Sequence, residues 1–240
     1  MKRFGLIGNP VAGSLSPRLF AAAYGGRYAY DLLEGASFDA SWQRFLDGYE
    51  GINITAPFKQ DAFRAVDRLS ESARLCGAVN LAVKTQDGVA GYNTDVDGVV
   101  LSVLETGLPV HEALVVGCGG AGRAAAVAAL RLGCRVTLAN RTASKAASLA
   151  DELGCGWTPL AGIAGLSPDL VVYTVPGPMD GFPAFPEAVV LEANYRTPCL
   201  EGCGKVYVPG QRWLLHQAVA GYSIFTEEQP DTDAMSRIFC

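Results

Sequence analysis

A lysine follows closely on a short apolar segment in the stretch Gly51-Ile-Asn-Ile-Thr-Ala-Pro-Phe-Lys59. Ile52 and Ile54 alternate with polar residues, which predicts the end of a β-strand. Pro57 cannot continue a sheet, so we expect the chain to turn there into a helix, with Lys59 just past the carboxyl end of the strand. Open α/β sheets bind ligands at that edge, and an amine held there can move a proton. A lysine on the first turn of a surface helix can also have no role, so other motifs must decide.

A glycine-rich loop joins a predicted strand, Ala113–Val116, to a predicted alanine-rich helix, Arg123–Leu132. Its glycines Gly117, Gly119 and Gly122 have the spacing G-x-G-x-x-G. The first permits a tight turn, the second lets a pyrophosphate approach the backbone, and the third lets helix and strand pack closely. The helix start offers unpaired N–H groups to the phosphates. An ordinary glycine-rich turn could have this composition, but its position between strand and helix favours a dinucleotide site.

The end of the following strand distinguishes between the two nicotinamide cofactors. NAD sites usually carry an acidic residue about 20 residues after the loop, which binds the ribose 2′-hydroxyl. Here the strand ends in Asn140-Arg141-Thr142, and Lys145 follows. Arg141 and Lys145 can bind a 2′-phosphate, and Thr142 can donate a hydrogen bond. Basic residues at a solvated helix start are otherwise mildly unfavourable, so the pattern predicts NADP rather than NAD.

Three further polar clusters follow predicted strands. Ser14 and Ser16 lie near a helix start, where two hydroxyls suit a carboxylate. Ser16 could instead cap that helix, with Pro17 at its first position. Asn80 could hold hydroxyl groups or merely fix a turn. Asp95, at the junction of two predicted domains, could cap the next helix.

Together these motifs define a reaction class. A nicotinamide cofactor carries a hydride, and an alcohol cannot lose hydride from carbon unless its hydroxyl proton also leaves. Lys59 could exchange that proton if its amine is available near neutral pH, and Asp95 would orient the amine and set its charge. The proton would be carried by Lys59 alone or by the Lys59–Asp95 pair.

Alternating strands and helices must position these groups, which predicts a two-domain α/β protein. The first domain, residues 1–98, would contain a mainly parallel sheet, with strands at 2–8, 28–33, 51–55, 79–84 and 89–92 and helical segments at 16–24, 38–49 and 58–75. The second domain, residues 99–209, would be a Rossmann-type dinucleotide-binding domain. Two helices are expected in the tail, at 213–222 and 232–239.

Composition restricts the class of protein. The chain has 240 residues, of which 50% are hydrophobic and 18% charged, as in a globular protein. Its net charge of −5 argues against a nucleic-acid partner. Its apolar runs are too short for a secretory signal or a membrane span. Seven scattered cysteines and two histidines predict a cytoplasmic protein with reduced thiols and no metal. We expect a monomer or a homodimer.

The chain resembles the shikimate dehydrogenase family over nearly its whole length. The matching segments occur in the family's order: Gly8-Asn-Pro with Ser14-Leu-Ser-Pro17, Gly51 to Lys59, Gly77-Ala-Val-Asn80, Gly91-Tyr-Asn-Thr-Asp95, Gly117 to Arg123, Asn140-Arg-Thr142, Tyr195 with Thr197-Pro198 and Leu200, and Leu214-Leu-His-Gln-Ala218. Each motif is modest alone, and together they are specific.

The resemblance implies reversible NADP-dependent reduction of 3-dehydroshikimate to shikimate, in aromatic amino-acid biosynthesis. It implies that Lys59 and Asp95 form the catalytic pair, in a cleft between two domains that close, and that residues 210–240 return to the first domain. The substrate would be held by Ser14, Ser16, Thr55, Asn80, Tyr195 and Gln217. The cofactor would be held by Gly117, Gly119, Gly120, Ala121, Gly122, Asn140, Arg141, Thr142, Lys145, Thr174 and Gly210.

The sequence departs from the family pattern at three places. Gly13 stands where the family usually has His, Tyr173-Thr174-Val175-Pro176 replaces the usual Asn-Ala-Thr segment, and the loop after Tyr195 is shorter. The nearest alternative is a relative that uses quinate, or both quinate and shikimate, with NAD or NADP. A non-catalytic, NADP-responsive binding protein is a further alternative, but such a protein would be expected to lose Lys59 or Asp95.

Overall fold

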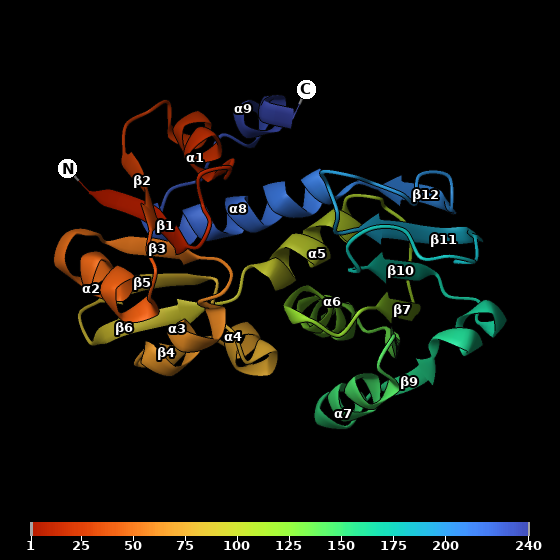
Figure 1. Cartoon of the computed structure of the whole chain (residues 1–240). Helices are drawn as coiled ribbons and strands as arrows, with labels where there is room; N and C mark the ends of the chain where they lie inside the picture. Colours follow the sequence, from red (N-terminus) through yellow and green to blue (C-terminus); the bar gives the residue numbers. More distant parts are fainter. Residues whose placement is uncertain (1, 240) are drawn as a thin grey trace. The chain divides into compact units, whose positions relative to one another are not determined.

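Two six-stranded sheets organise residues 2–239, the part of the chain that the computed structural model describes (Figure 1). The first unit ends at Thr94 and resumes at Gln217, and the second unit is Asp95–His216. The predicted domain limits lie at 98 and 209. Helix α8, Gly210–Thr226, therefore contributes its C-terminal part to the first unit. The α/β class predicted from the sequence is confirmed.

The first sheet is mixed. Strand β1 (Arg3–Gly8) pairs in parallel with β2 (Ala29–Glu34) and with β3 (Gly51–Ile54). The hairpin of β5 (Leu81–Thr85) and β6 (Gly88–Tyr92) then pairs antiparallel with β3. Gly88, with φ of +110°, supplies the left-handed backbone conformation that this tight turn requires.

Helices cover both faces of the first sheet. Helix α2 (Phe38–Gly48) and helix α3 (Lys59–Ala65) bury apolar side chains against one face, in a core that includes Ile7, Phe45 and Ile52. On the other face, the rings of Phe4 and Phe225 stack with centroids 5.0 Å apart. Helix α1 (Ser16–Tyr24) and the end of α8 contribute to this aromatic face.

The helical segments predicted between 58 and 75 are present as two helices, and a short strand that was not predicted separates them. After α3, the short strand β4 (Arg68–Leu69) pairs with β6, and α4 (Glu71–Cys76) follows. Asp67 N donates to Val89 O at 2.9 Å, so the chain is held extended there. Ser70 then accepts a hydrogen bond from Ala73 N and caps α4. Pairing with a strand distant in sequence overrides the local helical preference.

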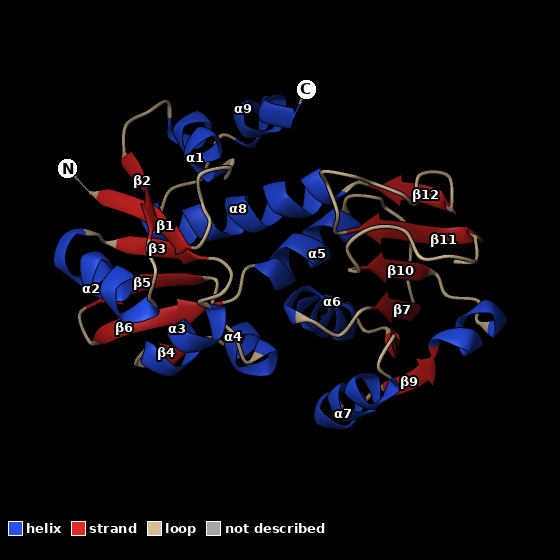
Figure 2. Cartoon of the chain, in the orientation of Figure 1, coloured by secondary structure: helices blue, strands red, loops and turns tan. Residues whose placement is uncertain are grey.

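The second sheet is wholly parallel, as expected for a Rossmann-type unit (Figure 2). Its strand order is β12 (Gly204–Val208), β11 (Phe185–Glu192), β10 (Leu170–Tyr173), β7 (Glu112–Val116), β8 (Arg135–Asn140) and β9 (Gly156–Pro159). The helices of this unit are α5 (Asp95–Leu104), α6 (Gly120–Arg131), α7 (Ala143–Leu153) and the 3₁₀ helix η1 (Leu160–Gly165). Strands β9 and β12 were not predicted.

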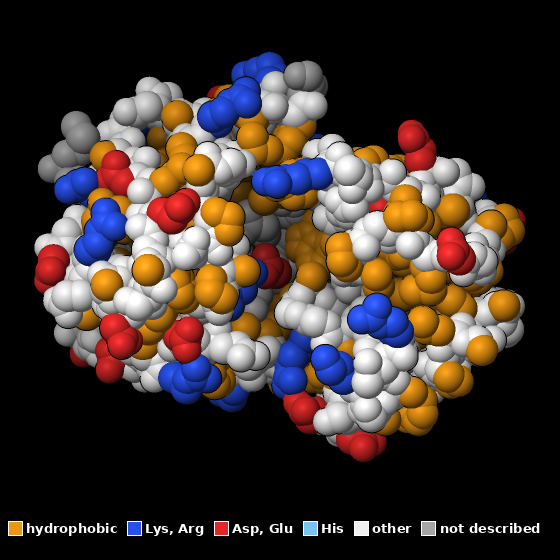
Figure 3. All heavy atoms as spheres, in the orientation of Figure 1, with side chains coloured by type: hydrophobic (Ala, Val, Ile, Leu, Met, Phe, Trp, Pro, Cys, Tyr) orange, Lys and Arg blue, Asp and Glu red, His pale blue; other side chains and the backbone are white. Residues whose placement is uncertain are grey.

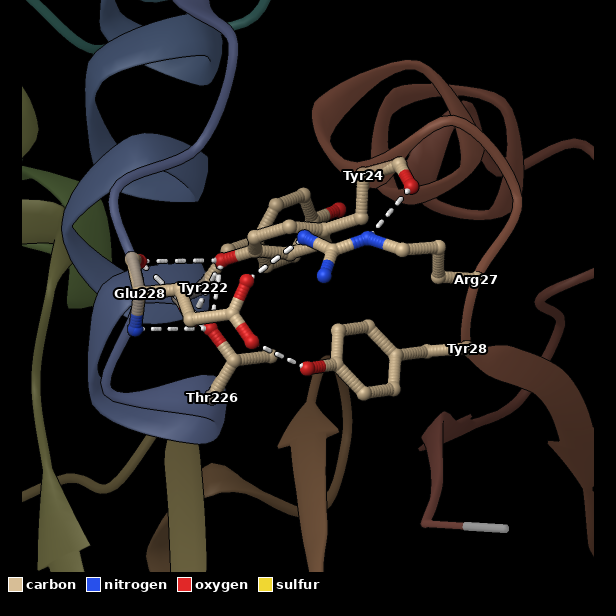
Figure 4. Close-up of polar contacts among 6 residues, drawn as sticks. All are labelled: Tyr24, Arg27, Tyr28, Tyr222, Thr226 and Glu228. Atoms are coloured by element: carbon tan, nitrogen blue, oxygen red, sulfur yellow. Dashed lines mark hydrogen bonds and ion pairs between the residues drawn. The ribbon is translucent and has the colours of Figure 1, made fainter.

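The C-terminal segment packs within the first unit. After α8, helix α9 (Thr232–Ser236) and the 3₁₀ turn η2 (Arg237–Phe239) contact α1. Glu228 accepts hydrogen bonds from Arg27 at 2.6 Å and from the Tyr28 hydroxyl at 2.5 Å (Figure 4).

Within residues 2–239, none of the helices combines the length and apolar character needed to cross a membrane.

Candidate active site

The topology of the first sheet brings the loops after β1 and β3 to one edge. The two strands are parallel neighbours, with Ile7 opposite Ile54. Beyond them, Thr55 N donates to Ile7 O at 3.0 Å, and Asn9 N donates to Ala56 O at 3.1 Å. The loop after β1 that carries Ser14 and Ser16, the serine loop, therefore leaves the sheet beside the segment that precedes Lys59.

The β5–β6 hairpin adds two more segments to the same edge. Because β5 runs antiparallel to β3, the residue before β5, Asn80, lies beside the end of β3, and its carbonyl accepts from Ile54 N at 2.8 Å. Asn80 N donates to Tyr92 O at 2.9 Å at the end of β6. Thr94 follows Tyr92 closely, so four motifs separated in sequence converge at one edge.

Ser14 and Ser16 are joined by two hydrogen bonds. Ser16 N donates to Ser14 Oγ at 3.2 Å, and Ser14 Oγ donates to Ser16 Oγ at 3.0 Å. The predicted cap at Ser16 is wrong, because α1 already begins at Ser16 and no side chain caps it. The Ser14 hydroxyl takes the Ser16 N–H instead. Both hydroxyls thus lie together beside an uncapped helix start.

A chain of polar contacts continues along this edge. The Tyr30 hydroxyl donates to Asn53 Oδ1 at 2.8 Å, and Asn53 Nδ2 reaches Asn80 O at 3.5 Å. Asn80 Oδ1 accepts from Thr94 N at 2.8 Å, and Thr94 Oγ1 lies 3.4 Å from Gln217 Oε1. Asn80 therefore fixes the turn at Thr94, one of its two predicted uses. Sequence reasoning did not assign roles to Tyr30, Asn53 or Thr94, although a polar Asn53 inside an apolar strand was a signal.

The two predicted proton-transfer residues each begin a helix. Lys59 is the first residue of α3, is partly exposed, and accepts a hydrogen bond on its carbonyl from Val79 N at 2.9 Å. Asp95 is the first residue of α5, directly after Thr94, and its carbonyl accepts from Trp213 Nε1 at 2.9 Å. Thr55, also partly exposed, accepts from Phe58 N in the turn before Lys59. Backbone hydrogen bonds thus fix the start of each helix.

The glycine loop of the second unit is shaped by steric limits. Gly117 has φ of +100°, which disfavours other residues, and a Cβ on Gly122 would lie 1.9 Å from Gly117 O. A Cβ on Gly119 or Gly120 would meet nothing within 4 Å. Gly119 stands at the N-cap of α6 without a side-chain cap, and Ala121 is exposed beside it. The first and third glycines are thus needed by the fold, while the middle ones leave open space.

This loop lies where the strand order of the second sheet reverses. Strands β7 and β10 are neighbours, and the chain leads away from them in opposite directions across the sheet. Thr174, directly after β10, donates to Val116 O at 2.8 Å, and its hydroxyl approaches Gly117. Open α/β sheets bind ligands in the crevice at such a switch point. The glycine loop and Thr174 therefore occupy the expected ligand edge.

The end of β8 presents positive charge. Arg141 and Lys145 are exposed, and neither forms an ion pair with any residue in the described range. Thr142 stands at the N-cap of α7, yet its hydroxyl does not cap the helix. Asn140 Oδ1 accepts from Cys118 N at 3.3 Å, so Asn140 links this strand end to the glycine loop.

Tyr195 and Gly210 lie near the end of β11. Tyr195 O accepts from Gln211 Nε2 at 3.3 Å. A Cβ on Gly210 would lie 2.7 Å from the carbonyl oxygens of both Glu192 and Ala193, so only glycine lets α8 start here. The loop that carries Tyr195 is fixed by Glu192, a fully buried carboxylate that sequence reasoning missed. Its hydrogen-bond donors are Cys199 N, Cys199 Sγ, Leu200 N and the Tyr207 hydroxyl.

Comparison with known proteins identifies the family. A relative from Rubrobacter xylanophilus, named shikimate dehydrogenase (NADP(+)), is 38% identical over 266 residues, covering 97% of this chain and 93% of the relative. The chain belongs to the shikimate dehydrogenase family. Residues 6–82 also match the family model described as the shikimate dehydrogenase substrate binding domain.

Solved structures of the shikimate dehydrogenase family share the fold. An enzyme from Thermus thermophilus, shikimate 5-dehydrogenase in complex with NADP(H) and shikimate, has a TM-score of 0.89 and 29% identity, covering 100% of this chain and 98% of its own. Quinate dehydrogenase from Corynebacterium glutamicum, in complex with NAD, has a TM-score of 0.88 and 27% identity, covering 99% of this chain and 98% of its own.

The segment that departs from the family pattern is nevertheless ordered within the second unit. Tyr173 is fully buried, and its hydroxyl donates to Gly177 O at 2.8 Å, which closes the turn through Thr174, Val175 and Pro176. Burial raises the pKa of Tyr173 to about 12, so the hydroxyl remains a donor at neutral pH.

No group of three or more His, Cys, Asp or Glu side chains suited to a metal ion occurs among the described residues. Charged side chains of both signs are interspersed on the face shown in Figure 3.

Proposed function

We propose that this protein is an NADP-dependent shikimate dehydrogenase, which interconverts shikimate and 3-dehydroshikimate. The observation that carries the proposal is the convergence of the paired serine hydroxyls, the Lys59 helix start and Asn80 at one edge of the first sheet. Such an edge suits a small ring that carries a carboxylate and several hydroxyls. Membership of the shikimate dehydrogenase family supports this substrate.

The second unit fits an NADP molecule. The open space at Gly119 and Gly120 accommodates a pyrophosphate at the uncapped start of α6. Exposed Arg141 and Lys145 suit the 2′-phosphate that distinguishes NADP from NAD. In the same proposal, Asn140, Thr142, Thr174 and Gly210 shape the remainder of the cofactor site.

The chemistry assigned to the chain is proton transfer and binding. When bound, NADP supplies the hydride acceptor, and NADPH supplies the donor for the reverse reaction. During oxidation, the Lys59 amine takes the proton of the reacting hydroxyl as the carbon loses hydride, and during reduction it returns that proton. The Asp95 carboxylate orients the Lys59 amine and balances its charge. Lys59 and Asp95 are the proposed catalytic residues.

The remaining residues hold the substrate. Ser14 and Ser16 donate hydrogen bonds to the carboxylate, which holds the ring in one orientation. The ring hydroxyls are assigned to Thr55, Asn80 and Gln217, with Tyr195 beside them. The proposal includes a cytoplasmic location and a monomeric or homodimeric state, which fractionation and sedimentation would test.

The test uses purified protein with each combination of shikimate or quinate and NADP or NAD. Formation of reduced nicotinamide should be fastest with shikimate and NADP. Preference for quinate would instead indicate the activity for which the Corynebacterium glutamicum relative is named. Absence of a signal in all four reactions would contradict the enzymatic proposal.

A further inference from the structure

A buried tyrosine of helix α8 hydrogen-bonds to the backbone of the serine loop. Tyr222, in α8, is 1% exposed, and its hydroxyl donates to Ser16 O at 3.1 Å. Tyr30, in β2, lies beside Tyr222, and its hydroxyl donates to Asn53 Oδ1 at 2.8 Å. The two rings lie 6.2 Å apart. The Tyr222 hydroxyl therefore holds the backbone of Ser16, which itself pairs with Ser14.

Tyr222 is held rigidly, so its hydroxyl has a fixed position. Its carbonyl accepts hydrogen bonds from the Tyr24 hydroxyl at 2.9 Å and from Thr226 Oγ1 at 3.0 Å, as Figure 4 shows. Its ring meets the Phe20 ring edge-on at 4.8 Å and lies roughly parallel to that of Phe225. A side chain held by contacts on the ring and on the backbone loses little further entropy when it positions a neighbour.

The Tyr222 side chain is neutral, which is compatible with a carboxylate bound at the nearby serine pair. Burial raises the pKa of its phenol far above the ordinary value, and hydrogen bonding to Ser16 opposes that shift only in part. The hydroxyl therefore stays neutral across the working pH range. It can donate to Ser16 without placing a negative charge near a bound carboxylate.

The serine loop requires such support. Gly13 precedes Ser14, α1 starts at Ser16 without a side-chain cap, and both hydroxyls are on short side chains. Phenylalanine at position 222 would fill nearly the same space without a polar group. A buried hydroxyl needs a hydrogen-bond partner, and for Tyr222 that partner is Ser16.

We propose that Tyr222 is a positioning residue for substrate binding: it fixes Ser16 so that the Ser14 and Ser16 hydroxyls point to a common carboxylate position. This inference rests on the proposed function, because it assumes that the serine pair binds the carboxylate of shikimate. Tyr222 acts through Ser16 and not on the substrate.

The test compares Tyr222→Phe with Tyr28→Phe in the full-length protein. Tyr28 belongs to the same aromatic cluster, but its hydroxyl donates to Glu228 rather than to Tyr222 or the serine loop. Loss of one neutral hydrogen bond predicts a rise of about fivefold in the shikimate KM and Kd of Tyr222→Phe. Its kcat and its NADP KM should stay within about twofold of wild type. Tyr28→Phe, which also removes one hydroxyl hydrogen bond, should lower Tm and leave the shikimate KM unchanged.

A double-mutant cycle with Ser16→Ala tests the route of action. If Tyr222 acts through Ser16, the Tyr222→Phe penalty should largely disappear once the Ser16 hydroxyl is absent. An unchanged shikimate Kd in Tyr222→Phe, equal changes in both tyrosine variants, or full additivity with Ser16→Ala would each overturn the inference. Failure of the unaltered protein to bind or oxidise shikimate would instead overturn the proposed function, and this inference with it.

Discussion

The ligand edge of the first sheet carries polar side chains that bond to one another, whereas the ligand edge of the second sheet combines open space at glycines with exposed basic side chains. Ser14 pairs with Ser16, and Asn80 pairs with Thr94. At the second edge, Gly119 and Gly120 offer open space, and Arg141 is exposed without an ion pair in the described range. Hydrogen bonds between side chains organise the edge of the first sheet. The edge of the second sheet instead offers space beside glycines and an exposed positive charge.

This difference assigns different physical tasks to the two units. Mutually bonded groups are held at fixed distances, which suits positioning of a reacting oxygen against a proton donor. A glycine backbone with exposed cationic side chains suits close approach of phosphates, for which charge matters more than exact placement. Changes in the first unit should therefore alter turnover or substrate binding, and changes in the second should alter cofactor affinity.

The largest expected effect is on turnover in the first unit. Lys59→Ala should lower kcat by about 10²-fold or more, because the proton donor is lost, while shikimate binding is largely kept. Steady-state kinetics together with a directly measured Kd separate the two. A variant with wild-type kcat and weakened binding would make Lys59 a binding residue and would remove the contrast between the two edges.

The glycines of the second unit should separate folding from binding. Gly122→Ala places a Cβ 1.9 Å from a carbonyl oxygen, so overpacking should cost about 1–3 kcal/mol in the free energy of unfolding and should weaken NADP binding at least tenfold. Gly119→Ala, which meets no atom within 4 Å, should cost at most about 1 kcal/mol as a poorer N-cap, and its main effect should be weaker NADP binding. Denaturant titration and ligand titration distinguish these outcomes. Gly165→Ala, also with open space around it, is the matched control and should change neither quantity.

Charge at the second edge should act on one cofactor only. Arg141→Ala should raise the NADP KM about tenfold and leave the NAD KM unchanged, since only NADP has the 2′-phosphate. The penalty should shrink as salt is added, because the exposed charge is screened. Arg64→Ala, which removes an exposed arginine paired with Asp61 in the first unit, is the control. Equal loss for NAD and NADP would show that Arg141 does not read the phosphate.

The smallest expected effect lies outside both edges. Hydrogen bonds from Tyr28 and then Arg27 hold the pKa of Glu228 below its ordinary value of 4.5. A carboxyl group with a lowered pKa in the folded state stabilises the fold above its ordinary pKa, and that contribution is lost as pH falls through the lowered value. Glu228→Gln should lower Tm by on the order of 1–2 °C at pH 7, and the difference should vanish in acid. Thermal melts at both pH values measure it, and an effect on kcat would contradict the separation from the site.

Local sequence rules predicted some elements and missed others for identifiable reasons. The strand–glycine–helix segment around Gly117 and Gly122 was predictable because its steric requirements involve neighbours in sequence. Strand β9 was missed because its residues are largely exposed and show no apolar alternation. Strand β4 and the backbone hydrogen bond at Asp67 depend on β6, more than twenty residues away, so no local pattern indicates them.

By itself, the sequence determined the family, the α/β class and the two groups of candidate residues, because strand ends, glycine spacing and charge depend on residues that are neighbours in the sequence. Only the tertiary structure decided how those residues are supported. Ser16 meets the Tyr222 hydroxyl across 206 residues of chain. Asn80 meets Thr94, and Glu192 holds the loop of Tyr195. A hydrogen bond between distant segments depends on how the sheets and helices bring them together, and that arrangement has no signature in either segment alone.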